Sequence, residues 1–117
     1  MKSVLYARFS PRPNARECES IEVQFDRCRA YCRAHGYDIV GEFADRAVSG
    51  DVTNRDGLVE ALDTACARHA VLVVYRLDRF ARDAEDALVN ARRLDEHGGG
   101  LASVTEEMNT RGSMGKF

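Results

Sequence analysis

The sequence predicts an α/β domain, with a mostly parallel sheet of four to five strands and helices on both faces. Short apolar, β-prone segments alternate along the chain with segments of helical period. The run Val71-Leu72-Val73-Val74-Tyr75 is wholly apolar, as expected for a central parallel strand that is covered on both faces. With 117 residues, 44% of them hydrophobic and 31% charged, the chain suits a single soluble domain.

The sequence argues against a membrane or secreted protein. No apolar run approaches the roughly 20 residues of a membrane-spanning helix. The N-terminus reaches Arg8 too early for the apolar region of a signal peptide, so we expect a cytoplasmic location. The cysteines form no CxxC pair and have no histidine at zinc-finger spacing, so we interpret them as small core side chains. They are Cys18, Cys28, Cys32 and Cys66.

The first predicted strand covers residues 2–9 and is followed by a loop that reaches Glu19. Prolines at positions 11 and 13 remove backbone donors there and prevent regular structure. Ser20 is a good N-cap for a helix that ends before Gly36, the residue expected in the left-handed conformation. The apolar positions expected on this helix are Ile21, Phe25, Cys28 and Cys32.

A second strand is predicted over residues 37–43, followed by a polar loop over residues 45–57. Ser49-Gly50 and Asp56-Gly57 are turn signals in this loop. A helix then begins at Leu58 and leads into the apolar strand at residues 71–75. The core positions expected on this helix are Leu58, Leu62, Ala65 and Cys66.

The last third of the chain predicts one more helix and one more strand. Residues 77–82 form a connector, and Asp83 is the expected cap of a helix that glycines 98–100 terminate. The fourth strand is expected at residues 101–105, and a turn-rich tail from residue 108 leads toward a further helix. The resulting order, β-α-β-α-β-α-β, favours parallel pairing of the strands.

Polar residues gather at the end of the first strand. Because side chains alternate between the two faces of a strand, Tyr6, Arg8 and Ser10 share one face. An arginine in such a strand is costly to bury without a partner, which suggests a positioned cation beside a hydroxyl group. We interpret Ser10 as a nucleophile and Arg8 as part of an anion pocket.

Two further polar sets follow the second and third predicted strands. Asp45 comes just past the second strand, and Asp78, Arg79 and Arg82 come just past the third. Ligands of open α/β sheets bind outside the carboxyl ends of the strands, so these residues are expected at one edge. Guanidinium groups bind phosphate oxygens in pairs, which makes this edge a candidate phosphate site.

Several alternatives remain open at this point. The Arg79–Arg82 segment could be a solvated loop with a surface ion pair. Tyr6 could be the nucleophile, and Asp45 with Asp78 could bind Mg²⁺. The histidines at positions 35, 69 and 97 fall in the last turns of predicted helices, where they complement the helix dipole, which argues against a Ser-His-Asp hydrolase.

The ordered motifs of the chain resemble the N-terminal catalytic domain of serine recombinases: the resolvases, invertases and large serine integrases. The matching segments are Tyr6-x-Arg8-x-Ser10, Ser20-Ile21-Glu22-x-Gln24, Asp45-x-x-x-Ser49-Gly50, Arg55-x-Gly57-Leu58, and Leu77-Asp78-Arg79-x-x-Arg82. The segments Thr105-Glu106-Glu107-Met108-Asn109-Thr110 and Met114-Gly115-Lys116 resemble the approach to the long dimerisation helix of the family. The likeness covers essentially the whole chain.

The resemblance implies that Ser10 attacks a DNA phosphate and becomes joined to the 5′ phosphate. It assigns Arg8, Arg79 and Arg82 to the scissile phosphate, and Asp78 to proton donation or to orienting an arginine. It also implies a set of supporting or phosphate-binding residues and requires neither a metal ion nor another cofactor. The supporting positions are Tyr6, Gln24, Asp45, Ser49 and Arg55.

The resemblance further implies double-stranded DNA as the substrate, and a homodimer and tetramer of the longer protein. On this reading residues 1–117 are a catalytic domain that stops at the start of the long helix, before a DNA-binding region, and the fragment alone is incompetent for strand exchange. The match departs from the family where Pro11 replaces the usual threonine. Rival functions from other classes are a non-catalytic phosphate- or DNA-binding regulatory α/β domain and a phosphatase that uses Ser10.

Overall fold

The computed structural model describes residues 1–9, 20–46, 56–77, 80 and 84–110. Within these ranges the secondary-structure elements follow the predicted order, with one additional short strand at the end. The elements are β1 (Lys2–Phe9), α1 (Ile21–His35), β2 (Asp38–Arg46), α2 (Asp56–Arg68), β3 (Val71–Val74), α3 (Ala84–Glu96), β4 (Gly100–Ser103) and β5 (Met108–Asn109).

The strands form one five-stranded sheet in the order β2-β1-β3-β4-β5. β1 pairs in parallel with both β2 and β3, and β3 pairs in parallel with β4. Only the short β5 runs antiparallel, against β4. The α/β class and the mostly parallel sheet predicted from the sequence are therefore confirmed.

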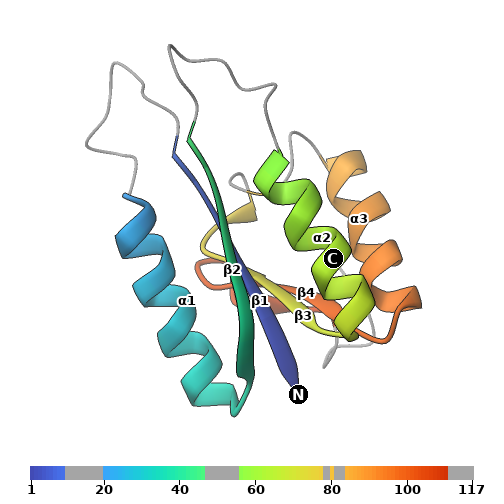
Figure 1. Cartoon of the computed structure of the whole chain (residues 1–117), viewed down its shortest axis with the longest axis horizontal. Coiled ribbons are helices and arrows are strands. Elements are labelled where there is room, and N and C mark those ends of the chain that lie inside the picture. Colours follow the sequence, from blue (N-terminus) through green and yellow to red (C-terminus); the bar gives the residue numbers. More distant parts are fainter. Residues whose placement is uncertain (10–19, 47–55, 78–79, 81–83, 111–117) are drawn as a thin grey trace.

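Helices cover both faces of the sheet, as predicted: α1 lies on one side, and α2 and α3 lie together on the other (Figure 1). The alternation along β1 explains this division. Val4 and Tyr6 belong to the larger core under α2 and α3, whereas Leu5 belongs to the smaller core under α1. The apolar strand β3 contributes to both cores, because its four residues are fully buried.

Local signals set the ends of α1 as expected. The Ser20 hydroxyl accepts a hydrogen bond from the Val23 amide at 3.2 Å, which satisfies one of the unpaired N–H groups of the first turn. Gly36 ends the helix with φ +70°, a conformation that glycine adopts without steric cost. The amides of Gly36 and Tyr37 donate to the carbonyls of Arg33 and Cys32, respectively.

The structure corrects several predicted boundaries. β2 extends from Asp38 to Arg46, beyond the predicted 37–43, because its ladder with β1 continues to the Phe9–Arg46 pair. Helix α2 begins at Asp56, so that Gly57 lies in its first turn and not in the loop. β4 covers Gly100–Ser103 instead of residues 101–105. The predicted turn-rich tail contains β5, and its later residues lie outside the described part.

The sequence predicts all four cysteines as small core side chains, and the structure confirms this for three of them. Cys28, Cys32 and Cys66 are buried and free, whereas Cys18 lies outside the described residues. Burial raises the pKa of the Cys28 thiol to about 12, so this thiol stays protonated at neutral pH. In the described ranges, no helix is long and apolar enough to cross a membrane.

Candidate active site

The strand order reverses direction at β1, since the chain moves from β1 out to β2 and then back to β3 on the other side. Open α/β sheets bind ligands at this kind of switch point, outside the carboxyl ends of the strands. Four of the ten site residues predicted from the sequence directly follow β1 or β3 in the chain: Ser10, Asp78, Arg79 and Arg82.

The carboxyl end of β1 is held by the side chain of Gln24. Its Oε1 accepts from the Arg8 amide at 3.2 Å, and its Nε2 donates to the Arg8 carbonyl at 2.9 Å. Pairing of β1 with β3 ends at Tyr6, so Arg8 lies beyond that ladder. The Gln24 amide thus acts like a short neighbouring strand and holds the backbone of Arg8 near the end of β1.

Gln24 reaches β1 because it lies on the buried face of α1. This face consists of Ile21, Gln24, Cys28 and Cys32, so a glutamine occupies a position of the apolar stripe. The sequence analysis placed Phe25 in this stripe, but Phe25 is only partly buried. A polar side chain at a stripe position was the available signal for the role of Gln24, because a fully buried amide requires partners.

A second buried contact joins β1 to β2. The Tyr6 hydroxyl, on a side chain with 0% exposure, donates to Asp45 Oδ2 at 2.7 Å. A phenol enclosed in this way and bonded to a carboxylate is badly placed to act as a nucleophile. The geometry therefore favours a supporting role for Tyr6 over the nucleophile alternative.

Asp45 also anchors the N-terminus of α2. Its carboxylate accepts from the Gly57 amide at 2.8 Å and from the Leu58 amide at 3.1 Å. A carboxylate at this position satisfies unpaired N–H groups and complements the helix dipole. We predicted Asp45 in a loop past the second strand, but it lies inside β2, because that strand is longer than its apolar pattern suggests.

Gly57 permits this close approach of α2 to β2. A Cβ atom at position 57 would lie 2.5 Å from the Ala44 carbonyl oxygen and 2.9 Å from Asp45 Oδ1. Real Cβ atoms essentially never come so close to backbone, so a larger residue would push the helix away from the carboxylate. From the sequence, Gly57 was a turn signal and part of the motif Arg55-x-Gly57-Leu58, but its close contact with β2 was not predicted.

Arg8 lies beside this anchor. It is the register partner of Asp45 on the neighbouring strand, and the alternation of β1 places it on the face of Tyr6. Arg8 is partly buried, as expected for a cation at the rim of a site. Its carboxylate neighbour on β2 is already engaged with three donors, which makes Asp45 a structural acceptor and not a free metal ligand.

The other predicted site residues lie outside the described part of the chain. They are Ser10, Ser49, Arg55, Asp78, Arg79 and Arg82. Their flanks are described: Phe9 ends β1, Asp56 begins α2, and Leu77 and Phe80 bracket residues 78 and 79. Among the described residues, no cluster of three or more His, Cys, Asp or Glu side chains could hold a metal ion.

The three histidines lie near the opposite edge of the sheet, because each stands at the end of a helix, shortly before the next strand begins: His35 ends α1, His69 follows α2 and His97 follows α3. The Nδ1 atoms of His35 and His97 donate to the carbonyls four residues earlier, at 2.9 Å and 2.8 Å. His69 Nδ1 donates to the His97 carbonyl at 2.6 Å. These contacts agree with the structural role predicted from the sequence.

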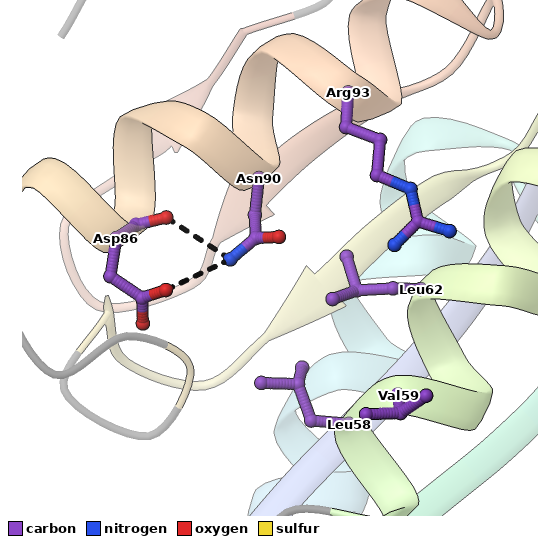
Figure 2. Close-up of a pocket in the computed structure, with 6 residues that line it drawn as sticks. All are labelled: Leu58, Val59, Leu62, Asp86, Asn90 and Arg93. Atoms are coloured by element: carbon purple, nitrogen blue, oxygen red, sulfur yellow. Dashed lines mark hydrogen bonds between the residues drawn. The ribbon is translucent and has the colours of Figure 1, made fainter.

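A pocket of about 280 Å³ lies between α2 and α3 (Figure 2). Leu58, Val59 and Leu62 line it from α2. On α3, Asn90 bonds back to Asp86 of its own helix, and Arg93 pairs with Asp63 at 2.7 Å. Because its one cation is already paired and its α2 wall is apolar, this pocket does not suit a phosphate.

The fold and the described contacts define an α/β domain whose candidate site lies at the carboxyl ends of the first and third strands. The family model described as "Resolvase, N terminal domain" matches residues 3–117. The chain therefore belongs to this family, the catalytic domain of the serine recombinases.

Curated relatives carry names from the same family. The chain is 36% identical over 75 residues to the DNA-invertase hin of Salmonella typhimurium, a match that covers 64% of this chain and 38% of that protein. It is 32% identical over 90 residues to the Transposon Tn552 resolvase of Staphylococcus aureus, a match that covers 77% of this chain and 42% of that protein. The matches thus span about two fifths of the length of these relatives.

Solved structures share the fold over nearly the whole chain. A resolvase family site-specific recombinase from Streptococcus pneumoniae superposes with a TM-score of 0.80 at 25% identity, covering 95% of this chain and 76% of that one. The N-terminal catalytic domain of TP901-1 integrase superposes with a TM-score of 0.79 at 25% identity, and the match covers 98% of this chain and 85% of that one. The fold match therefore extends beyond the 64% of the chain that aligns to the invertase.

Proposed function

We propose that this chain is the catalytic domain of a site-specific DNA recombinase that uses Ser10 as its nucleophile. Ser10 Oγ forms a bond to the phosphorus of a DNA phosphodiester while the bond from phosphorus to the 3′ oxygen breaks. The serine proton passes to a base, and the departing 3′ oxygen takes up a proton to become a hydroxyl group. The new phosphoserine ester retains the phosphodiester for religation after strand exchange.

The arginines supply the charge that this reaction needs. Phosphoryl transfer depends mainly on positioning and on stabilising negative charge on the phosphoryl oxygens. In this proposal Arg8, Arg79 and Arg82 hold the scissile phosphate, and Arg55 acts at the same site. Asp78 donates the proton or orients an arginine, and Ser49 supports the phosphate site.

The single observation that carries the proposal is the fixed end of β1. Gln24 makes hydrogen bonds to both backbone polar groups of Arg8, two residues before Ser10. Asp45 accepts a hydrogen bond from the Tyr6 hydroxyl, two residues before Arg8 on the same strand. A rigid end of β1 next to Ser10 supports the proposal, because positioning of the reacting groups is a large part of catalysis. Gln24, Tyr6 and Asp45 are accordingly supporting residues that do not touch DNA.

The proposal extends to partners and location. The substrate is double-stranded DNA, and strand exchange takes place in a tetramer that assembles from homodimers in the cytoplasm. Because the curated relatives are more than twice as long as the matched region, we expect residues 1–117 alone to bind DNA weakly and not to exchange strands. The test therefore uses the complete gene product.

The decisive experiment traps a covalent adduct on a DNA strand that is labelled at its 3′ end. Ser10 joins the 5′ phosphate of the 3′ fragment, so the label is expected to remain with the protein. Ser10→Ala is expected to abolish the adduct, and Arg8→Ala to slow its formation about 10²-fold, comparable to loss of an oxyanion donor. Adduct yield is measured on a denaturing gel after quenching.

Ser20→Ala is the matched control. It removes a hydroxyl group that caps α1 outside the candidate site, at a cost of about 1 kcal/mol in folding free energy, and is expected to leave adduct formation intact. An adduct that survives Ser10→Ala would sink the proposed nucleophile. Binding of DNA by the unchanged protein without any adduct would instead favour the regulatory-domain alternative.

A further inference from the structure

The segment beyond β3 is tied to the segment beyond β4. The parallel pairing of the two strands ends at Val74 and Ser103, but the main chains remain side by side. The Val104 amide donates to the Val74 carbonyl at 3.0 Å, and the Thr105 amide donates to the Tyr75 carbonyl at 3.0 Å. These bonds bring Glu106 next to the segment that leads from β3 to residues 78 and 79.

Glu106 bridges the two segments through its carboxylate. Its two oxygens lie 3.3 Å and 3.4 Å from the Leu77 amide, which donates to them. The hydroxyl groups of Ser103 and Thr105 also donate to Oε1. Burial raises the pKa of Glu106, but these hydrogen bonds outweigh burial and hold the pKa below its usual value, in agreement with an engaged carboxylate.

The other end of the segment is fixed in the core. Phe80 has 2% exposure and belongs to the core under α2 and α3, and Leu77 packs against the same core. The Phe80 amide donates to the Leu77 carbonyl at 2.9 Å, which closes the span from residue 77 to residue 80. Leu77 and Phe80 are therefore both anchored, and the anchor of the Leu77 amide is Glu106.

We propose that Glu106 is a positioning residue that acts through the backbone of Leu77 on the reaction assigned to Asp78 and Arg79. Asp78 and Arg79 are separated from Glu106 by more than 25 positions, yet the Leu77 amide that Glu106 binds directly precedes them. The carboxylate holds the backbone of Leu77 and does not itself contact the phosphate. This inference rests on the proposed function, because it assigns Asp78 and Arg79 to the reaction.

The test compares Glu106→Ala with Glu107→Ala in the complete gene product. Both changes remove one exposed carboxylate from adjacent positions, but the carboxylate of Glu106 is the one that binds Leu77. Glu106→Ala is expected to slow adduct formation about tenfold at saturating DNA, since a small misplacement of a catalytic group lowers the rate of the chemical step. The dissociation constant for DNA is expected to stay within twofold, and Glu107→Ala is expected to match the unchanged protein.

Hydrogen exchange distinguishes an effect of Glu106 on Leu77 from a general loosening of the turn between β4 and β5. Glu106→Ala is expected to speed exchange at Leu77 and Phe80, while Thr110, whose amide donates to the Leu101 carbonyl across the β4–β5 pair, exchanges as before. Equal acceleration at Thr110 would mean that Glu106 only holds the turn, and would overturn the inference. A rate of adduct formation equal to that of Glu107→Ala would overturn it as well.

If Glu106→Ala does not fold, Glu106→Gln replaces it in the test. The glutamine amide keeps one acceptor for the Leu77 amide, so Glu106→Gln is expected to form the adduct at no less than half the rate of the unchanged protein. A loss of adduct comparable to that of Ser10→Ala would contradict a positioning role. If the unchanged protein forms no adduct, the proposed function fails. Exchange at Leu77 and Phe80 then decides the Glu106 contact independently.

Discussion

Two carboxylates hold backbone amides on opposite sides of the candidate site, and their surroundings differ. Asp45 has 9% exposure and binds the Tyr6 hydroxyl and the first amides of α2. Glu106 is exposed and binds the Leu77 amide at longer distances, near 3.3 Å. The first contact is part of the core, whereas the second lies at the surface of the domain.

This difference indicates distinct roles. Removing a buried acceptor leaves donors without partners in a place that water cannot reach, so the cost falls on folding. Removing an exposed acceptor lets water replace it, so the cost falls on the exact path of the chain. We therefore expect changes at Asp45 to act mainly on stability and changes at Glu106 mainly on reaction rate.

Asp45→Ala is expected to have the largest effect. It leaves the Tyr6 hydroxyl and the amides of Gly57 and Leu58 without their acceptor, at a cost of about 3 kcal/mol in unfolding free energy. Urea unfolding followed by circular dichroism measures this change. Asp45→Asn keeps one acceptor oxygen and is expected to lose about half as much unfolding free energy. If Asp45→Ala were as stable as the unchanged protein, Asp45 would not anchor α2 to the sheet.

Gly57→Ala is expected to have an intermediate effect on the same anchor. The added Cβ atom would meet the Ala44 carbonyl oxygen at 2.5 Å, and the backbone shift costs about 2 kcal/mol in unfolding free energy. Gly36→Ala is the matched control, because no atom lies within 4 Å of its Cβ position and only the left-handed φ of +70° is penalised, by about 1 kcal/mol. A larger loss at Gly36 than at Gly57 would contradict the close packing of α2 on β2.

Glu106→Gln is expected to have the smallest effect on stability, with a defined pH dependence. The pKa of Glu106 lies below its usual value near 4.5 in the folded protein, so its stabilisation is present above that pH and is lost as the pH falls through the lower, folded value. Exposure limits this contribution to less than about 1 kcal/mol. Unfolding free energies of the unchanged protein and of Glu106→Gln are compared at pH 7 and pH 3. A difference between the two proteins that grows toward pH 3 would contradict this assignment.

The sequence by itself determined the features that depend on neighbouring residues. Ser20 and Gly36 fixed the ends of α1, the apolar run from Val71 identified β3, and the alternation of β1 assigned its two faces. Capping, turn conformation and hydrophobic period operate over a few residues, so they can be recognised without knowledge of the fold.

The tertiary structure alone decided the contacts that shape the candidate site. The Tyr6–Asp45 bond joins residues 39 positions apart, and the Leu77–Glu106 bond joins residues 29 positions apart. The length of β2 and the presence of β5 likewise depend on pairing with β1 and β4, not on their own apolar pattern. No local signal encodes these partners, because their proximity arises only when the strand order of the sheet brings distant segments together.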